Sequence, residues 1–159
     1  MFKKEPNKNK KRNNKPKQES EFDQRLVDLA RVTRVTRGGK RLNFRACIVI
    51  GDNKGKVGYG VAKGSDVTIA INKAVKQAKK RLIIPPKNDG TVPHQIKQKF
   101  KAALVSIRPA KKGRGIIAGG AVRTVLELAG YKDVVAKMIG SRNKINNVKA
   151  VYAALKNFR

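Results

Sequence analysis

Apolar residues recur along the chain with two different periods, and each period predicts a different kind of element. From Leu42 to Ile50 every second residue is apolar, which predicts a strand with one buried face. From Ser65 or Asp66 to about Leu82 apolar residues instead recur every three or four positions, which predicts an amphipathic helix. Its expected buried stripe is Val67, Ala70, Ile71, Ala74, Val75, Ala78 and Leu82. Strands and helices therefore alternate within one stretch, which indicates an α+β fold.

The same reasoning predicts the other elements of the first half of the chain. Residues 21–29 have the apolar spacing of a short helix, and residues 31–37 resemble a strand that ends at a turn containing Gly38 and Gly39. Residues 51–55 predict a second turn, and residues 57–61 a third strand. Glycines occupy positions 51, 55, 58, 60 and 64. We interpret them as hairpin glycines and not as a dinucleotide-binding fingerprint, because a strand rather than a helix follows the turn.

The second half follows a boundary at residues 84–90, where two prolines oppose both helix and strand pairing. Strands are predicted at residues 94–100, 102–108 and 134–139, and helices at 121–129 and 144–157. The last helix is expected to bury Ile145, Val148, Val151, Tyr152 and Leu155. The chain then divides into a disordered basic arm (1–20), a first domain (21–86), a linker (87–92) and a C-terminal α/β domain (93–159).

A basic loop at residues 108–120 contains four glycines and leads into the helix predicted at 121–129. The glycines let the backbone approach a bulky partner, and the first helical turn offers free N–H groups to an anion. Lys111, Lys112, Arg114 and Arg123 are expected to add positive charge at the same place. The loop therefore predicts a phosphate site for a nucleic acid or a nucleotide, with a ligand-free turn as the simpler alternative. A P-loop is absent, because Ala-Val stands where Lys and Ser or Thr are required.

The charge of the chain favours a polyanionic partner. Lys and Arg number 39 against 10 acids, a net charge of +29, and the arm at residues 1–20 holds +6 of it, which leaves +23 on the remainder. Nucleic acid is favoured over a membrane surface, because no apolar run approaches 18 residues and residues 1–4 fit neither a secretory signal nor a myristoylation site. Lys73, Lys76, Lys79 and Lys80 line one side of the predicted helix. They form either a solvated face or an RNA contact.

The residue types needed for catalysis are scarce. Five of the ten acids lie at or before Asp28, and the others stand singly at turns and helix ends, so no acid–base pair is apparent. His94 and Cys47 are the only residues of their kinds, which excludes an internal disulfide and leaves too few ligands for zinc. Aromatic residues are 5% of the chain, which disfavours modules that stack single-stranded bases. We expect no enzyme, no metal and no cofactor.

Several stretches resemble one family, the bacterial small-subunit ribosomal protein five. The stretches are TRGGKR at 36–41 followed by Phe44, GDNKGKVGYG at 51–60, GTVPH at 90–94, GIIAGGAVR at 115–123, and GS at 140–141 with Asn143. They extend over about residues 21–158 in the family's order and spacing, so together they are specific. The sequence is similar to the family without matching it everywhere. Gln98 and Ala102 stand where members often have glycine, Lys144 replaces a common proline, and a C-terminal extension that many members carry is expected to be missing.

The resemblance implies a first domain like the double-stranded-RNA-binding fold and a C-terminal, left-handed βαβ-type domain, a βαβα sandwich. It implies binding to 16S ribosomal RNA near the junction of body and head, with small-subunit proteins four and eight as neighbours. It also implies a share in assembly, in decoding accuracy and in lining the path by which messenger RNA enters. The location is then the cytoplasm, in the ribosome, without membrane insertion or homo-oligomers.

The family motifs and the basic positions around them give the expected site residues. Those for RNA are Arg34, Arg37, Gly38, Gly39, Lys40, Arg41, Lys54, Lys56, Lys63, Lys111 and Lys112. Those for protein contact and accuracy are Arg114, Gly115 and Arg123. Two other functions remain open: a free-standing RNA-binding or RNA-chaperone protein, and a nucleotide-binding kinase relative of the second domain.

Overall fold

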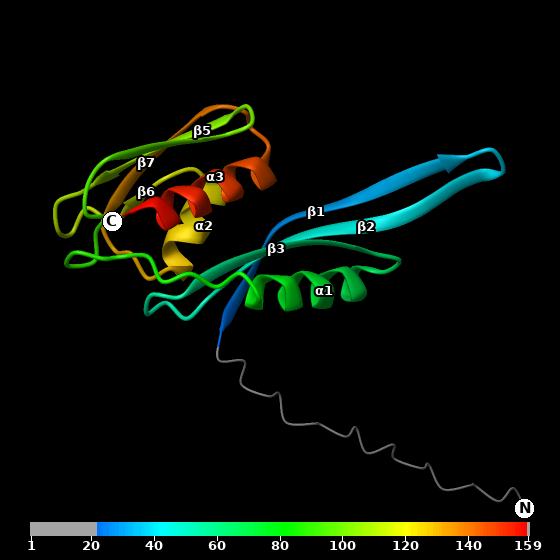
Figure 1. Ribbon diagram of the computed structural model, residues 1–159, viewed down its shortest axis with the longest axis horizontal. Coiled ribbons are helices and arrows are strands. Elements are labelled where there is room, and N and C mark those ends of the chain that lie inside the picture. The colour runs from blue at the N-terminus through cyan, green and yellow to red at the C-terminus, as the bar shows by residue number, and fades with distance from the viewer. Residues whose placement is uncertain (1–21, 159) are drawn as a thin grey trace, which may run out of the picture.

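A computed structural model describes residues 22–158, so the basic arm predicted for residues 1–20 lies outside the described residues. The described chain forms two sheets and three helices in two adjoining units (Figure 1). This arrangement confirms the expected α+β fold with two small domains.

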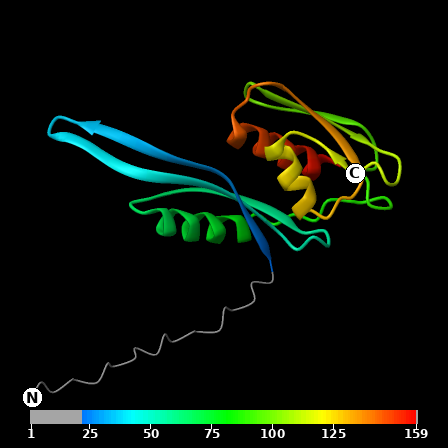
Figure 2. The same ribbon diagram turned by 180° about the vertical axis from the view of Figure 1, so that it is seen from behind.

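The N-terminal unit is an antiparallel sheet of three strands with one helix on its face. β1 (Asp23–Thr36), β2 (Gly39–Gly51) and β3 (Val57–Gly64) pair in the order β1-β2-β3, and α1 (Val67–Lys79) follows. β3 pairs only with the second half of β2, from Phe44 onward. The other ends of β1 and β2 therefore project from the body as a two-stranded hairpin (Figures 1 and 2).

The helix predicted at residues 21–29 is wrong, because these residues belong to β1. Their N–H and C=O groups pair with β2, from Asp23 opposite Gly51 onward. A bulge between Leu26 and Asp28 inserts Val27 as an extra residue, and Val27 packs against the core between the two units. The inserted residue changes the alternation of apolar side chains, so their spacing imitates a helical period.

Helix α1 lies unusually close to β3, and small residues on both elements are the reason. Its buried residues are Ala70, Ala74 and Ala78. A Cβ atom added to Gly60 would lie 2.0 Å from the carbonyl oxygen of Ala74, and one at Gly58 2.6 Å from that of Ala78. The interpretation of all these glycines as hairpin residues therefore needs correction. Gly55, with a φ of 149°, belongs to the turn, whereas Gly58 and Gly60 provide space for the helix backbone.

The C-terminal unit is a four-stranded sheet with two helices on one face (Figure 1). Its elements are β4 (Ile96–Phe100), β5 (Ala103–Pro109), β6 (Ile116–Ile117), α2 (Gly120–Leu128), β7 (Val134–Gly140) and α3 (Lys144–Asn157). The strand order is β4-β5-β7-β6, and only β6 and β7 are parallel, so β6, α2 and β7 form a βαβ unit. The two-residue strand β6 was not predicted, because a strand this short has no recognisable period.

The two units share a hydrophobic core. Ile48 and Ile50 on β2 pack on the α1 side, whereas Cys47 and Val49 belong to a cluster that also contains Leu126 of α2. All five residues from Ala46 to Ile50 are consequently buried, although only one face was expected to be. The first sheet is thus covered by α1 on one face and by the C-terminal unit on the other.

Candidate nucleic-acid interface

The tip of the β1–β2 hairpin gathers six of the expected RNA-binding residues: Arg34, Arg37, Gly38, Gly39, Lys40 and Arg41. Arg34 stands opposite Arg41, and Val35 opposite Lys40, while Arg37 and Gly38 form the two-residue turn. Every residue from Thr33 to Leu42 is exposed. The antiparallel register therefore places four cations together at the end of a projecting ribbon (Figure 2).

The hairpin tip is open to a partner in both charge and shape. None of its cations forms an ion pair with a carboxylate of residues 22–158. Val35 and Leu42 are 71% and 51% exposed, which is high for apolar side chains beside such charge. A Cβ atom at Gly38 or Gly39 would meet no atom within 4 Å, so packing within the chain does not require glycine at either position.

Lys54 and Lys56 lie at the opposite end of β2 from the hairpin tip, in the turn that leads to β3 (Figure 1). Asp52 organises this turn, because its Oδ1 atom accepts hydrogen bonds of 2.8 Å from the N–H groups of Lys54, Gly55 and Lys56. Partial burial acts to raise the pKa of Asp52, but these N–H donors outweigh it and lower that pKa below its usual value.

Lys63 is separate from both ends of the sheet. It stands on β3 opposite Arg45, which interacts with Asp28 at 3.4 Å. The structure therefore brings together the expected RNA-binding residues of the hairpin, but it places Lys54, Lys56 and Lys63 elsewhere on the sheet.

The basic loop between β5 and α2 has a different shape from the one expected. The N–H group of Arg114 donates to the carbonyl oxygen of Lys111, and Gly113 and Gly115 have φ values of 85° and 75°. The N–H group of Gly115 donates to Oδ1 of the buried Asp133 at 2.7 Å. Gly115 thus has a structural role in fixing the loop against the start of β7.

Lys111, Lys112 and Arg114 do not lie at the N-terminus of α2, which corrects the expected single phosphate site. Residues 116–119, including β6, separate them from the helix by about 13 Å of extended chain. The helix starts at a cavity of about 490 Å³ lined by Gly120, Ala121, Met138, Gly140, Ser141, Arg142, Lys144 and Asn147. Lys112 instead pairs with Asp89 at 3.2 Å on the surface.

Arg123 was expected to need a nearby anion, and the structure supplies one within the same helix. Its Nε atom donates to Oε1 of Glu127 at 2.7 Å. The other oxygen of Glu127 accepts from Arg25 of β1, so the carboxylate joins the two units. The hydrogen bond from Arg123, with help from Arg25 and against partial burial, lowers the pKa of Glu127.

Sequence reasoning missed two surface features made by residues far apart in the chain. One is the joining of Arg25 to Glu127, which was hidden by the wrong helix at residues 21–29. The other is a groove beside α1, called the α1 groove below, whose lining includes Gln77 and Arg81. The row of lysines on the predicted helix was the signal for the second, but a row alone does not show that a groove exists.

The remaining reactive side chains form no site. Cys47 is buried, and burial together with the charge of Asp28 raises the pKa of its thiol to about 11. His94 is exposed and touches Phe158 edge-to-face. Within residues 22–158 no three His, Cys, Asp or Glu side chains gather as a metal site would require. No helix in this range is both long and apolar enough to cross a membrane.

Comparison with protein families decides what the chain is related to. Residues 22–84 match the model described as "Ribosomal protein S5, N-terminal domain", and residues 98–159 match "Ribosomal protein S5, C-terminal domain". The chain belongs to the ribosomal protein S5 family. This is a family of structural ribosomal components and not of enzymes, in agreement with the expectation from the sequence.

Similar proteins support the assignment to the S5 family. The chain is 52% identical to "Small ribosomal subunit protein uS5" of Mycoplasma mobile and 50% identical to that of Mycoplasmopsis agalactiae, over 99% and 88% of its own length. It is 48% identical to "Small ribosomal subunit protein uS5c" of Rhodomonas salina, over 92% of its length and 89% of that protein. The chain spans 66% and 61% of the first two relatives, which is less than two thirds of their length.

Proposed function

We propose that this protein is a structural constituent of the small ribosomal subunit and binds 16S ribosomal RNA near the junction of body and head. The observation that carries the proposal is the projecting hairpin tip, with its unpaired cations and its two glycines free of internal contacts. A ribbon of this kind reaches structured RNA away from the body of the protein, and its glycines let the RNA approach the backbone. The relatives named as small-subunit proteins support the same partner.

The other basic positions contribute from separate surfaces. Lys54, Lys56 and Lys63 border the first sheet, and Lys111 and Lys112 extend from the second unit. An RNA that folds around the protein can meet all of these, whereas a single straight duplex cannot. The place of action is then the ribosome in the cytoplasm, close to the path by which messenger RNA enters.

Reconstitution of small subunits tests this function. The variant with Arg34, Arg37, Lys40 and Arg41 all changed to Ala is mixed with 16S ribosomal RNA and the other small-subunit proteins. Sedimentation through a sucrose gradient in moderate salt then measures incorporation. We expect loss of most incorporation, because each lost phosphate contact reduces the salt dependence of binding by about 0.9 in the log–log slope.

A matched control removes the same charge elsewhere. Changing Lys97, Lys99, Lys137 and Lys156 to Ala removes four exposed cations outside the hairpin. Equal losses for the two variants would contradict a specific role for the hairpin tip. A wild-type protein that binds duplex RNA but stays at the top of the gradient would favour the free-standing RNA-binding protein instead.

We further propose that the C-terminal unit contacts small-subunit proteins four and eight, and that Arg114, Gly115 and Arg123 act in decoding accuracy. Arg114 is exposed beside a glycine with fixed geometry, so its guanidinium is free to bind a carboxylate or phosphate. Arg123 is half engaged by Glu127 and remains exposed, so it can exchange this partner for one on a neighbouring protein.

Stop-codon readthrough measures this role. Arg114→Ala and Arg123→Ala are expected to enter ribosomes normally and to change readthrough several-fold, because an exposed ion pair contributes about 1 kcal/mol or less. Arg108→Ala, another exposed arginine at the end of β5, serves as the control and should leave readthrough unchanged. Normal incorporation of both variants with wild-type readthrough would refute the accuracy role.

A further inference from the structure

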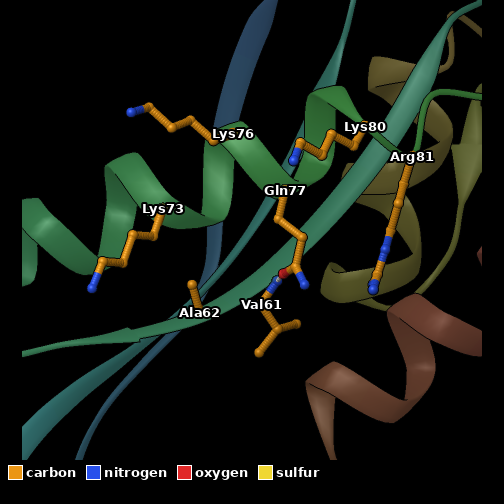
Figure 3. Close-up of a pocket in the computed structure, with 7 residues that line it drawn as sticks. All are labelled: Val61, Ala62, Lys73, Lys76, Gln77, Lys80 and Arg81. Atoms are coloured by element: carbon orange, nitrogen blue, oxygen red, sulfur yellow. Dashed lines mark hydrogen bonds between the residues drawn. The ribbon is translucent and has the colours of Figure 1, made fainter.

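The α1 groove has a volume of about 460 Å³ and lies between α1 and β3, the outer strand of the first sheet. Its lining consists of Val61, Ala62, Lys73, Lys76, Gln77, Lys80 and Arg81. Gln77 points from the helix onto β3, with Lys73 on one side of it and Arg81 on the other (Figure 3). The groove depends on the close packing of α1, because Gly58 and Gly60 bring the helix down onto the strand.

The floor of the groove has no unsatisfied backbone donor at its centre. The N–H group of Val61, on the outer edge of β3, donates to Oε1 of Gln77 at 2.8 Å. The amide of Gln77 is thereby held against the strand, and the apolar side chains of Val61 and Ala62 remain accessible beside it. An edge strand sealed in this way does not recruit another strand, so the groove is suited to side-chain contacts with a ligand.

Arg81 is held in place from the other unit of the protein. Its guanidinium carbon lies 5.5 Å from the centre of the Tyr59 ring, and this ring meets Tyr152 of α3 edge-to-face at 4.7 Å. The hydroxyl of Tyr152 donates to the carbonyl oxygen of Arg81 at 3.0 Å. Stacking on an aromatic face orients the guanidinium before any ligand binds, so less conformational entropy is lost on binding.

The cations of the groove lack acidic partners. Within residues 22–158, Lys73, Lys76, Lys80 and Arg81 form no ion pair, whereas the carboxylates of Asp28, Asp89 and Glu127 pair with cations elsewhere. No acidic residue lines the groove. Positive groups at both ends of a partly apolar floor match a sugar–phosphate backbone, which carries regularly spaced anions around less polar sugars.

We propose that the α1 groove is a second RNA-backbone site, in which Lys73, Lys80 and Arg81 bind phosphates while Tyr59 and Tyr152 position Arg81. The proposal rests on the proposed function, because it takes structured ribosomal RNA as the partner. It extends that function to a surface separate from the hairpin tip. Through Tyr152, it also makes the site dependent on contact between the two units.

Two neighbouring lysines of α1 provide a matched comparison. Lys80 lines the groove, whereas Lys79 is exposed on the same helix and does not. Full-length Lys80→Ala and Lys79→Ala proteins are titrated with a 16S ribosomal RNA transcript at several salt concentrations. We expect Lys80→Ala to weaken binding about fivefold to tenfold and to lower the log–log salt slope by about 1, and Lys79→Ala to change neither appreciably.

The positioning role of Tyr152 requires a readout other than stability. Tyr152→Ala is expected to weaken RNA binding about threefold or more in the wild-type background and to have no further effect in an Arg81→Ala background. Tyr152→Phe keeps the ring against Tyr59 and should retain most of the affinity. Urea unfolding of each variant shows whether the fold is intact, and an equal effect of Tyr152→Ala in both backgrounds would refute the positioning role.

The outcomes separate this proposal from the proposed function. A wild-type protein that does not bind the 16S transcript would refute the function as a whole. Wild-type binding together with equal, small effects of Lys80→Ala and Lys79→Ala would overturn the groove site alone. Equal and large effects of the two would also overturn it, because binding would then follow total charge and not the groove.

Discussion

At the scale of single residues, the absence of a side chain matters as much as its presence. Gly58, Gly60 and Gly64 lie on β3 beneath Ala78, Ala74 and Ala70 of α1, and an added Cβ would approach the backbone of each to 2.7 Å or less. These distances are shorter than non-bonded carbon contacts allow. The alanine spacing in the sequence predicted the buried stripe of the helix, but it did not show that glycines would face it, because the pairing of strand with helix is set by tertiary structure.

Gly60→Ala is expected to lower the free energy of unfolding by about 1–3 kcal/mol, since the new methyl group forces α1 away from β3. Urea unfolding measures this change. Gly38→Ala is the control, because a Cβ there meets no atom within 4 Å and its unfolding midpoint should stay near the wild-type value. An equal midpoint for the two variants would mean that the helix moves freely and that close packing does not stabilise this unit.

At the scale of elements, patterns in the sequence identified most helices and strands but failed where the chain departs from a simple period. α3 matches its predicted range, residues 144–157, and Asn143 caps it by accepting hydrogen bonds from Ile145 and Asn146. β1 was mistaken for a helix in its first part, because the bulge at Val27 breaks the alternation. The projection of the hairpin could not be predicted either, since it results from β3 being shorter than β2.

The hairpin allows function to be separated from folding. Gly38→Val is expected to leave the unfolding midpoint of the free protein unchanged, because its Cβ has open space and its φ lies outside the left-handed region. The added bulk should nevertheless reduce incorporation into reconstituted subunits, because it prevents close approach of RNA to the backbone. Gradient sedimentation and urea unfolding measure the two effects. Equal losses in both would indicate an ordinary turn without a ligand.

At the scale of the whole molecule, contacts between the two units explain why the first sheet is buried on both faces. The N–H group of Asn53 donates to the carbonyl oxygen of Leu128 at 3.1 Å, and the hydroxyl of Tyr131 donates to that of Pro86 at 2.9 Å. Lys87 lies 5.6 Å from the centre of the Tyr131 ring, and burial lowers its pKa despite the nearby Asp52. None of these pairs has a signature in the sequence, because each joins residues that only the fold brings together.

Glu127 is the charged group that most directly joins the two units, through Arg25 of β1 and Arg123 of α2. Its pKa is lowered in the folded protein, so its contribution to stability is complete above its ordinary pKa of about 4.5 and is lost as the pH falls through the lower folded value. Wild-type protein should therefore lose stability below about pH 5 more steeply than Glu127→Gln does.

A double-mutant cycle at pH 7 then shows whether the ion pair couples the units. Arg25→Gln and Glu127→Gln are each expected to lower the free energy of unfolding by about 0.5–1 kcal/mol, because the pair is partly exposed. The double variant should lose less than the sum of the two, since each single change already removes the shared contact. Arg31→Gln, an exposed arginine on β1 outside this pair, is the control and should combine additively with Glu127→Gln. Additive losses for Arg25 and Glu127 would show that apolar contacts alone hold the units together.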